Sequence, residues 1–92
     1  MMDYSKKQLE SIEKMASVYM TITDIANILD VPADVLREDV STREHPARKA
    51  YIEGKSASKL KLRAQEMKLA QVGSPLALEN CSKALIEMED DE

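Results

Sequence analysis

The chain of 92 residues contains no phenylalanine and no tryptophan, and its only aromatic residues are Tyr4, Tyr19 and Tyr51. Its apolar content is therefore almost entirely aliphatic, in residue types that favour helices. A domain of this size buries only about 60–65% of the surface that its unfolded chain exposes. Because little aromatic volume is available to fill a core, we expect the chain to gain buried area by forming a homo-oligomer.

Cysteine, histidine and glycine are also scarce, which excludes several kinds of site. Cys81 and His45 are the only residues of their types, so neither an internal disulfide nor a zinc knuckle is available. We expect Cys81 to be a small buried thiol and His45 to lie in a surface loop. The two glycines, Gly54 and Gly73, do not form a phosphate-binding loop. We therefore expect no enzymatic activity, no catalytic residue, no metal ligand and no cofactor.

The sequence has no apolar run of the roughly 18 residues that a membrane span requires, and no charged-then-apolar leader opens it. We expect a cytoplasmic protein without a membrane partner. The net charge of −4 conceals three blocks of different sign. Residues 1–42 hold four basic and eight acidic residues, 43–68 hold eight and three, and 69–92 hold one and six. The clustered positive charge at the centre is compatible with an anionic partner.

The apolar residues recur at a spacing near 3.6, which predicts an all-α protein. Five helices are expected, near residues 5–18, 22–29, 33–40, 46–72 and 75–88. The inner face of the first helix is predicted to comprise Leu9, Ile12, Ala16 and Tyr19. That of the third is predicted to comprise Val35, Leu36 and Val40.

The segment from Thr21 to Leu36 resembles the helix-turn-helix motif of bacterial and phage DNA-binding proteins, with the spacing T-x-x-D-I-A-x-x-L-D-V-P-x-x-x-L. Thr21 is the expected N-cap, with Asp24 completing a capping box. Ala26 is small enough for two helices to cross closely, and Asp30 tolerates the left-handed conformation of a tight turn. The alternative is two short core helices joined by a turn.

The outward positions of the predicted recognition helix carry a net charge of −1. They are Ala33, Asp34, Arg37, Glu38 and Ser41. A helix that reads bases in a DNA groove normally presents Arg, Lys, Asn or Gln. If the protein binds DNA, contacts to phosphates from other residues must therefore dominate.

The longest predicted helix, residues 46–72, carries most of the positive charge. Its residues Arg48, Lys55, Lys59 and Arg63 fall within an arc of about 80°, and we call this set the basic stripe. The predicted DNA-binding residues are Arg37, Ser41, Arg43, Arg48, Lys55, Lys59 and Arg63. The alternative is that the stripe is only a solvated helix face, since Glu66 lies on the same arc.

The same helix has two apolar seams, one of which can face a neighbouring subunit. The first comprises Ala50, Ala57, Leu60, Ala64 and Met67, and the second is centred on Tyr51, Leu62 and Leu69. Gly54 weakens the helix by about 1 kcal/mol relative to alanine, so a kink or break near 54–58 is an alternative to one continuous helix.

Gly73, Ser74 and Pro75 are expected as the C′, N-cap and N1 residues that join the last two helices into an antiparallel hairpin. The apolar stripe of the last helix is predicted to comprise Ala77, Leu78, Cys81, Ala84, Leu85 and Met88. We therefore predict a helix-turn-helix DNA-binding unit in residues 1–42, a helical hairpin for oligomerisation in 43–88 and an acidic tail in 89–92.

The run Ala50-Tyr51-x-x-Gly54-Lys55, followed by Leu62-Arg63 and Leu69-Ala70-x-x-Gly73-Ser74-Pro75-x-Ala77, resembles the second half of small terminase subunits of tailed phages and prophages. Together with the helix-turn-helix, the resemblance covers roughly residues 18–88. In that family a helix-turn-helix domain precedes helices that build a multi-subunit ring. The ring recognises viral DNA and stimulates the ATPase and nuclease of the large subunit.

The resemblance implies non-enzymatic binding of double-stranded DNA, with a large terminase subunit as a further partner. Two alternatives remain open at this point. One is a prophage helix-turn-helix transcriptional regulator, and the other is a helical protein–protein interaction module that does not bind DNA.

Overall fold

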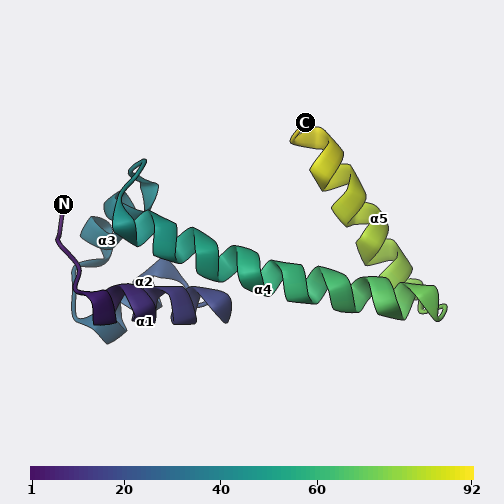
Figure 1. Cartoon of the computed structure of the whole chain (residues 1–92), viewed down its shortest axis with the longest axis horizontal. Coiled ribbons are helices and arrows are strands. Elements are labelled where there is room, and N and C mark those ends of the chain that lie inside the picture. Colours follow the sequence, from purple (N-terminus) through teal and green to yellow (C-terminus); the bar gives the residue numbers. More distant parts are fainter. The chain divides into compact units, whose positions relative to one another are not determined.

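The computed structural model describes all 92 residues and contains five α-helices and no strand (Figure 1). The helices are α1 (Lys6–Ser17), α2 (Ile22–Leu29), α3 (Ala33–Ser41), α4 (Pro46–Gln71) and α5 (Pro75–Asp90). The all-α prediction is confirmed, and α4 continues through Gly54 without the break that the sequence left open. None of the helices combines the length and the apolar character needed to cross a membrane.

The chain divides into two compact units, which we call the N-terminal unit, Met1–Ser58, and the C-terminal unit, Lys59–Glu92. This division differs from the predicted segments, whose first boundary follows residue 42. The first part of α4 belongs to the N-terminal unit because Ala47, Ala50 and Gly54 are buried there.

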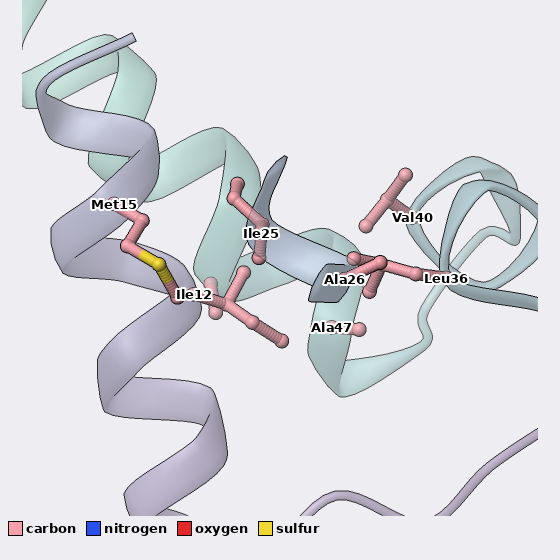
Figure 2. Packing of buried hydrophobic residues seen from close by; sticks show 8 residues of the cluster. Ile12, Met15, Ile25, Ala26, Leu36, Val40 and Ala47 are labelled. Carbon is pink, nitrogen blue, oxygen red and sulfur yellow. The ribbon is translucent and has the colours of Figure 1, made fainter. Parts of the chain in front are cut away.

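The core of the N-terminal unit is small and aliphatic, with contributions from four helices. Figure 2 shows Ile12 and Met15 of α1, Ile25 and Ala26 of α2, Leu36 and Val40 of α3, and Ala47 of α4 packing together. Ile12, Ile25 and Leu36 are its largest fully buried apolar side chains. This core orients α2, α3 and the start of α4 relative to one another.

Tyr19 does not join this core, so its predicted place on the inner face of the first helix is wrong. The helix α1 ends at Ser17, and Tyr19 takes a left-handed conformation with φ of 60° in the turn that follows. Its side chain is 50% exposed. Beyond the end of a helix the backbone no longer keeps the 3.6-residue period on which the prediction rested.

Local turn and cap chemistry follows the predictions closely. The Thr21 hydroxyl caps α2 by accepting the Asp24 backbone N–H, and Asp30 ends that helix with φ of 58°. Gly73, with φ of 92°, precedes α5, and the Ser74 hydroxyl accepts the Ala77 N–H. The capping box predicted at Thr21 and Asp24 is only half present, because the Thr21 hydroxyl makes its bond but the Asp24 side chain does not bond back to the Thr21 backbone. The complete capping box lies at the start of α1, between Ser5 and Gln8.

The C-terminal unit has almost no core. Ala77 is its only buried residue, and the rest of the predicted stripe on α5 is largely uncovered. Leu78, Leu85 and Met88 are 51%, 52% and 55% exposed. Cys81 is half-buried, so the expectation of a buried thiol is wrong, because the two helices of the C-terminal unit are too few to enclose it.

Candidate nucleic-acid interface

Five of the predicted DNA-binding residues lie in the N-terminal unit, and all five are exposed. They are Arg37, Ser41, Arg43, Arg48 and Lys55. None of the four cations among them has a carboxylate within ion-pair distance. Their charge is therefore available to a partner.

The side chains of α3 are held by local hydrogen bonds. Arg37 donates from Nη2 to the Thr23 hydroxyl of α2 over 3.3 Å. Ser41 donates its hydroxyl proton to the Arg37 carbonyl at 2.8 Å, within the same helix. The bond to Thr23 fixes the Arg37 guanidinium between α2 and α3 without neutralising it.

The basic residues of α4 in this unit are oriented by α3 and by a neighbouring ring. Arg48 donates from Nη1 to the Val40 carbonyl at 3.1 Å, near the end of α3. Lys55 places its ammonium 5.1 Å from the centre of the Tyr51 ring, a cation–π arrangement. Both groups keep donors free for phosphate oxygens.

Lys49 is a further exposed cation that the basic stripe did not include. With Arg48 it lines a shallow hollow of about 620 Å³ at the start of α4, and Glu44 and Glu53 line the same hollow, so two cations and two carboxylates share it. One residue corresponds to 100° of helix rotation, so Lys49 falls outside the arc of the stripe. In the sequence, Lys49 contributed only to the positive net charge of residues 43–68.

Lys59 and Arg63 lie in the C-terminal unit and are paired with one carboxylate. Lys59 Nζ is 3.2 Å from Glu87 Oε1, and Arg63 Nη2 is 3.1 Å from Glu87 Oε2. The hydrogen bond from Lys59, then that from Arg63, holds the pKa of Glu87 below its ordinary value. Lys59 and Arg63 are therefore already paired with a carboxylate of the same chain.

A polar cluster that sequence reasoning missed lies beside the start of α4. Asp39 of α3 is fully buried, and its Oδ2 accepts the Tyr4 hydroxyl at 2.7 Å and the Met2 N–H at 3.2 Å. Burial alone would raise the pKa of Asp39, but these hydrogen bonds and the positive groups nearby lower it below 3.8. Burial, together with the bond to Asp39, raises the pKa of Tyr4 above 10.0.

His45 belongs to this cluster, so its predicted place as a surface loop residue is wrong. Its side chain is 9% exposed, and its Nδ1 accepts the Ala47 N–H at 3.0 Å, as an N-cap of α4 does. Its Nε2 lies 3.2 Å from the Met2 carbonyl and 3.8 Å from Asp39 Oδ1. The cluster thus fixes the start of α4, where Arg48 and Lys49 lie.

The structure contains no group of three or more His, Cys, Asp or Glu side chains that could hold a metal ion. Comparisons of the chain with protein-family models, with curated proteins and with solved structures gave no match.

Proposed function

We propose that this protein is a non-enzymatic, cytoplasmic DNA-binding protein that grips duplex DNA mainly through its phosphates. The observation that carries the proposal is a group of exposed cations within residues 37–55 of the N-terminal unit that have no carboxylate partner. They are Arg37, Arg43, Arg48, Lys49 and Lys55. Residues 37–55 hold five basic and four acidic residues, a net charge of +1, whereas the whole N-terminal unit holds eight basic and ten acidic residues. The proposal therefore rests on the local group of unpaired cations and not on a positively charged unit.

The outward positions of α3 argue against base reading by this helix. Asp34 and Glu38 are exposed on α3 beside Arg37, and neither has an ion-pair partner. Carboxylates on a groove-facing surface repel phosphates, so α3 contributes little favourable charge. The more basic start of α4 and Arg43 are the better candidates for backbone contacts.

Salt dependence tests the proposal, because each neutralised phosphate releases counterions. The slope of log K against log salt is expected to be about −0.9 for each phosphate contact. We would measure anisotropy of labelled duplexes of unrelated sequence with an Arg43→Ala/Lys55→Ala variant. The slope should become less steep by about 1.8, equally for all duplexes.

A matched control comes from Lys6 and Lys7, two exposed lysines of α1 outside the predicted site. Lys6→Ala/Lys7→Ala makes the same change in net charge and should leave the slope near that of the wild type. Equal effects of both variants would mean that only overall charge matters. Absence of salt-sensitive binding in the wild type would refute DNA binding.

The resemblance to small terminase subunits makes DNA packaging the preferred setting for this activity, with a large terminase ATPase and nuclease subunit as the partner. A prophage transcriptional regulator is the alternative, and stimulation of a large subunit's ATPase by the protein would separate the two.

A specific observation also supports protein–protein contact through the C-terminal unit. This unit, Lys59–Glu92, is shorter than the roughly 40 residues below which a folded unit usually needs oligomerisation or another staple. Leu60 of α4 and Leu76 of α5 are 71% and 66% exposed. We therefore include homo-oligomerisation through this unit in the proposal, and an interaction module without DNA binding is the competing function.

A further inference from the structure

In the C-terminal unit one carboxylate, that of Glu87, pairs with two cations of the basic stripe. Lys59 and Arg63 are one turn apart on α4, and each occupies a different oxygen of Glu87. A phosphate group offers the same feature, two adjacent anionic oxygens for two cations. The three side chains are 54%, 38% and 62% exposed, so a competing anion from solvent can reach them.

Little else holds α5 in this position. The only other polar link between the two helices is the Asn80 amide, which donates to Glu66 at 3.4 Å. A groove of about 1210 Å³ separates apolar residues of the two helices, with Leu62 and Met67 on one wall and Leu85 and Met88 on the other. Exposed ion pairs contribute little to stability and are weakened by salt. Another anion can therefore replace Glu87 at Lys59 and Arg63 without the unfolding of a hydrophobic core.

The chain beyond Gly73 is itself a local polyanion. It carries one basic residue, Lys83, which pairs with Glu79 one turn away. Its six acidic residues are Glu79, Glu87, Glu89, Asp90, Asp91 and Glu92. Because this segment is tethered to α4 by a short turn, its effective concentration at Lys59 and Arg63 is about millimolar or higher. A tethered anion at such a concentration competes with a phosphate for the same cations.

We infer that α5 is an autoinhibitory element, in which Glu87 occupies the phosphate-binding positions of Lys59 and Arg63 until DNA displaces it. The inference rests on the proposed DNA-binding function and adds its regulation. In the free protein these two cations are screened, whereas the cations of the N-terminal unit are not. DNA is then engaged first by the N-terminal unit, and contact with Lys59 and Arg63 requires the release of Glu87.

The test is Glu87→Gln in the full-length chain, which keeps the size of the side chain and removes its charge. Affinity for duplex DNA should rise about fivefold at low salt, the size expected for loss of one exposed competing ion pair. The matched control is Glu89→Gln on the same helix, because Glu89 has no ion-pair partner. It makes the same charge change and should raise affinity much less. Circular dichroism of each variant verifies that the helices are retained.

A double-mutant cycle identifies the cations involved. In a Lys59→Ala/Arg63→Ala background, Glu87→Gln should no longer change DNA affinity. An unchanged gain in that background, or an equal gain with Glu89→Gln, overturns the inference and leaves only a general effect of net charge. Wild-type DNA binding with no effect of Glu87→Gln also overturns it while leaving the proposed function intact. Failure of every variant to bind DNA overturns both.

Discussion

Gly54 of α4 lies directly against the backbone of Glu13 in α1. A Cβ at Gly54 would overlap the Glu13 carbonyl oxygen and lie 3.1 Å from the Ala16 Cβ. The glycine that the sequence marked as a weak point of the helix is therefore the residue that lets two helices approach closely. The low helix propensity of Gly54 is offset by the close packing of α1 and α4 that it permits.

Gly54→Ala should destabilise the protein, although glycine to alanine inside a helix is normally favourable by about 1 kcal/mol. Overlap with backbone atoms forces the helices apart, and such overpacking costs about 1–3 kcal/mol. We expect a net loss of about 1 kcal/mol in the free energy of unfolding, measured in urea. Ser56→Ala, at an exposed position of the same helix, is the control and should be neutral or slightly stabilising. A Gly54→Ala variant more stable than the wild type would contradict the contact.

Helix boundaries were predictable because their signals are local. The hydroxyls of Thr21 and Ser74 act on backbone groups three residues away, and Asp30 and Gly73 adopt left-handed conformations that few other residues tolerate. Such interactions involve residues that are close together in the sequence, so they can be recognised without the structure.

The burial of Asp39 and the pairing of Glu87 were not predictable, because both depend on partners far away in the sequence. Asp39 bonds to Tyr4, 35 residues earlier, and Glu87 to Lys59, 28 residues earlier. The periodicity of a sequence shows which residues lie on the same face of a helix, but it does not show which distant residue packs against that face. The candidate site was therefore only partly predictable: the exposed cations could be named, apart from Lys49, but the carboxylate that pairs with Lys59 and Arg63 could not.

Tyr4→Phe should lower stability because it removes the hydroxyl that donates to the buried Asp39 carboxylate at 2.7 Å. A hydrogen bond to a charged group contributes about 1.5–3 kcal/mol, and a loss of this size is expected in urea unfolding. Tyr19→Phe, at an exposed turn position without a hydroxyl contact, is the matched control and should change little. Equal stabilities of the two variants would mean that the Tyr4 bond does not support the fold.

Asp39 should also make the N-terminal unit sensitive to acid. Its pKa in the folded protein lies below the ordinary 3.8, so its stabilising contribution is complete above that value. The contribution is lost as the pH falls through the folded-state pKa, because a protonated carboxyl binds Tyr4 and Met2 more weakly. All three tyrosines lie in the N-terminal unit, so tyrosine fluorescence reports its unfolding.

Asp39→Asn provides the comparison for this acid dependence. The variant should be less stable than the wild type at neutral pH, and its stability should fall less steeply below pH 3.8. Identical acid profiles for the two proteins would show that other carboxylates account for the loss.

If the protein forms a homo-oligomer through the first apolar seam of α4, adding negative charge to that seam should weaken the assembly. Leu60 is 71% exposed and Ala64 is exposed one turn later. Leu60→Glu/Ala64→Glu should shift the assembly towards monomer, measured by light scattering at tens of micromolar, roughly the range where weak functional oligomers form. The control is Gln65→Glu/Ser82→Glu, which adds the same charge at exposed positions of α4 and α5 outside the seam. A wild-type mass equal to the 10.3 kDa of one chain would contradict oligomerisation.

A comparison of alanine variants at Arg48 and Lys49 should separate the contribution of a cation to stability from its contribution to DNA binding. Arg48 donates to the Val40 carbonyl, one of the last carbonyls of α3, which have no partner within the helix. Its positive charge also lies favourably at the negative end of that helix dipole. Lys49 is the next residue of α4, but its side chain makes no hydrogen bond or ion pair. The same change to alanine therefore removes one charge in both cases and a capping bond in only one.

Arg48→Ala should lower the free energy of unfolding by about 1 kcal/mol, whereas Lys49→Ala should leave it unchanged. If both residues contact phosphates, each variant should also make the salt slope of DNA binding less steep by about 0.9. Arg48→Lys keeps the charge but loses the planar guanidinium, so its slope should stay near the wild type while part of the stability is lost. Equal stabilities of Arg48→Ala and Lys49→Ala would show that the bond to Val40 contributes nothing. A slope changed by Arg48→Ala alone would restrict the phosphate contacts to the basic stripe.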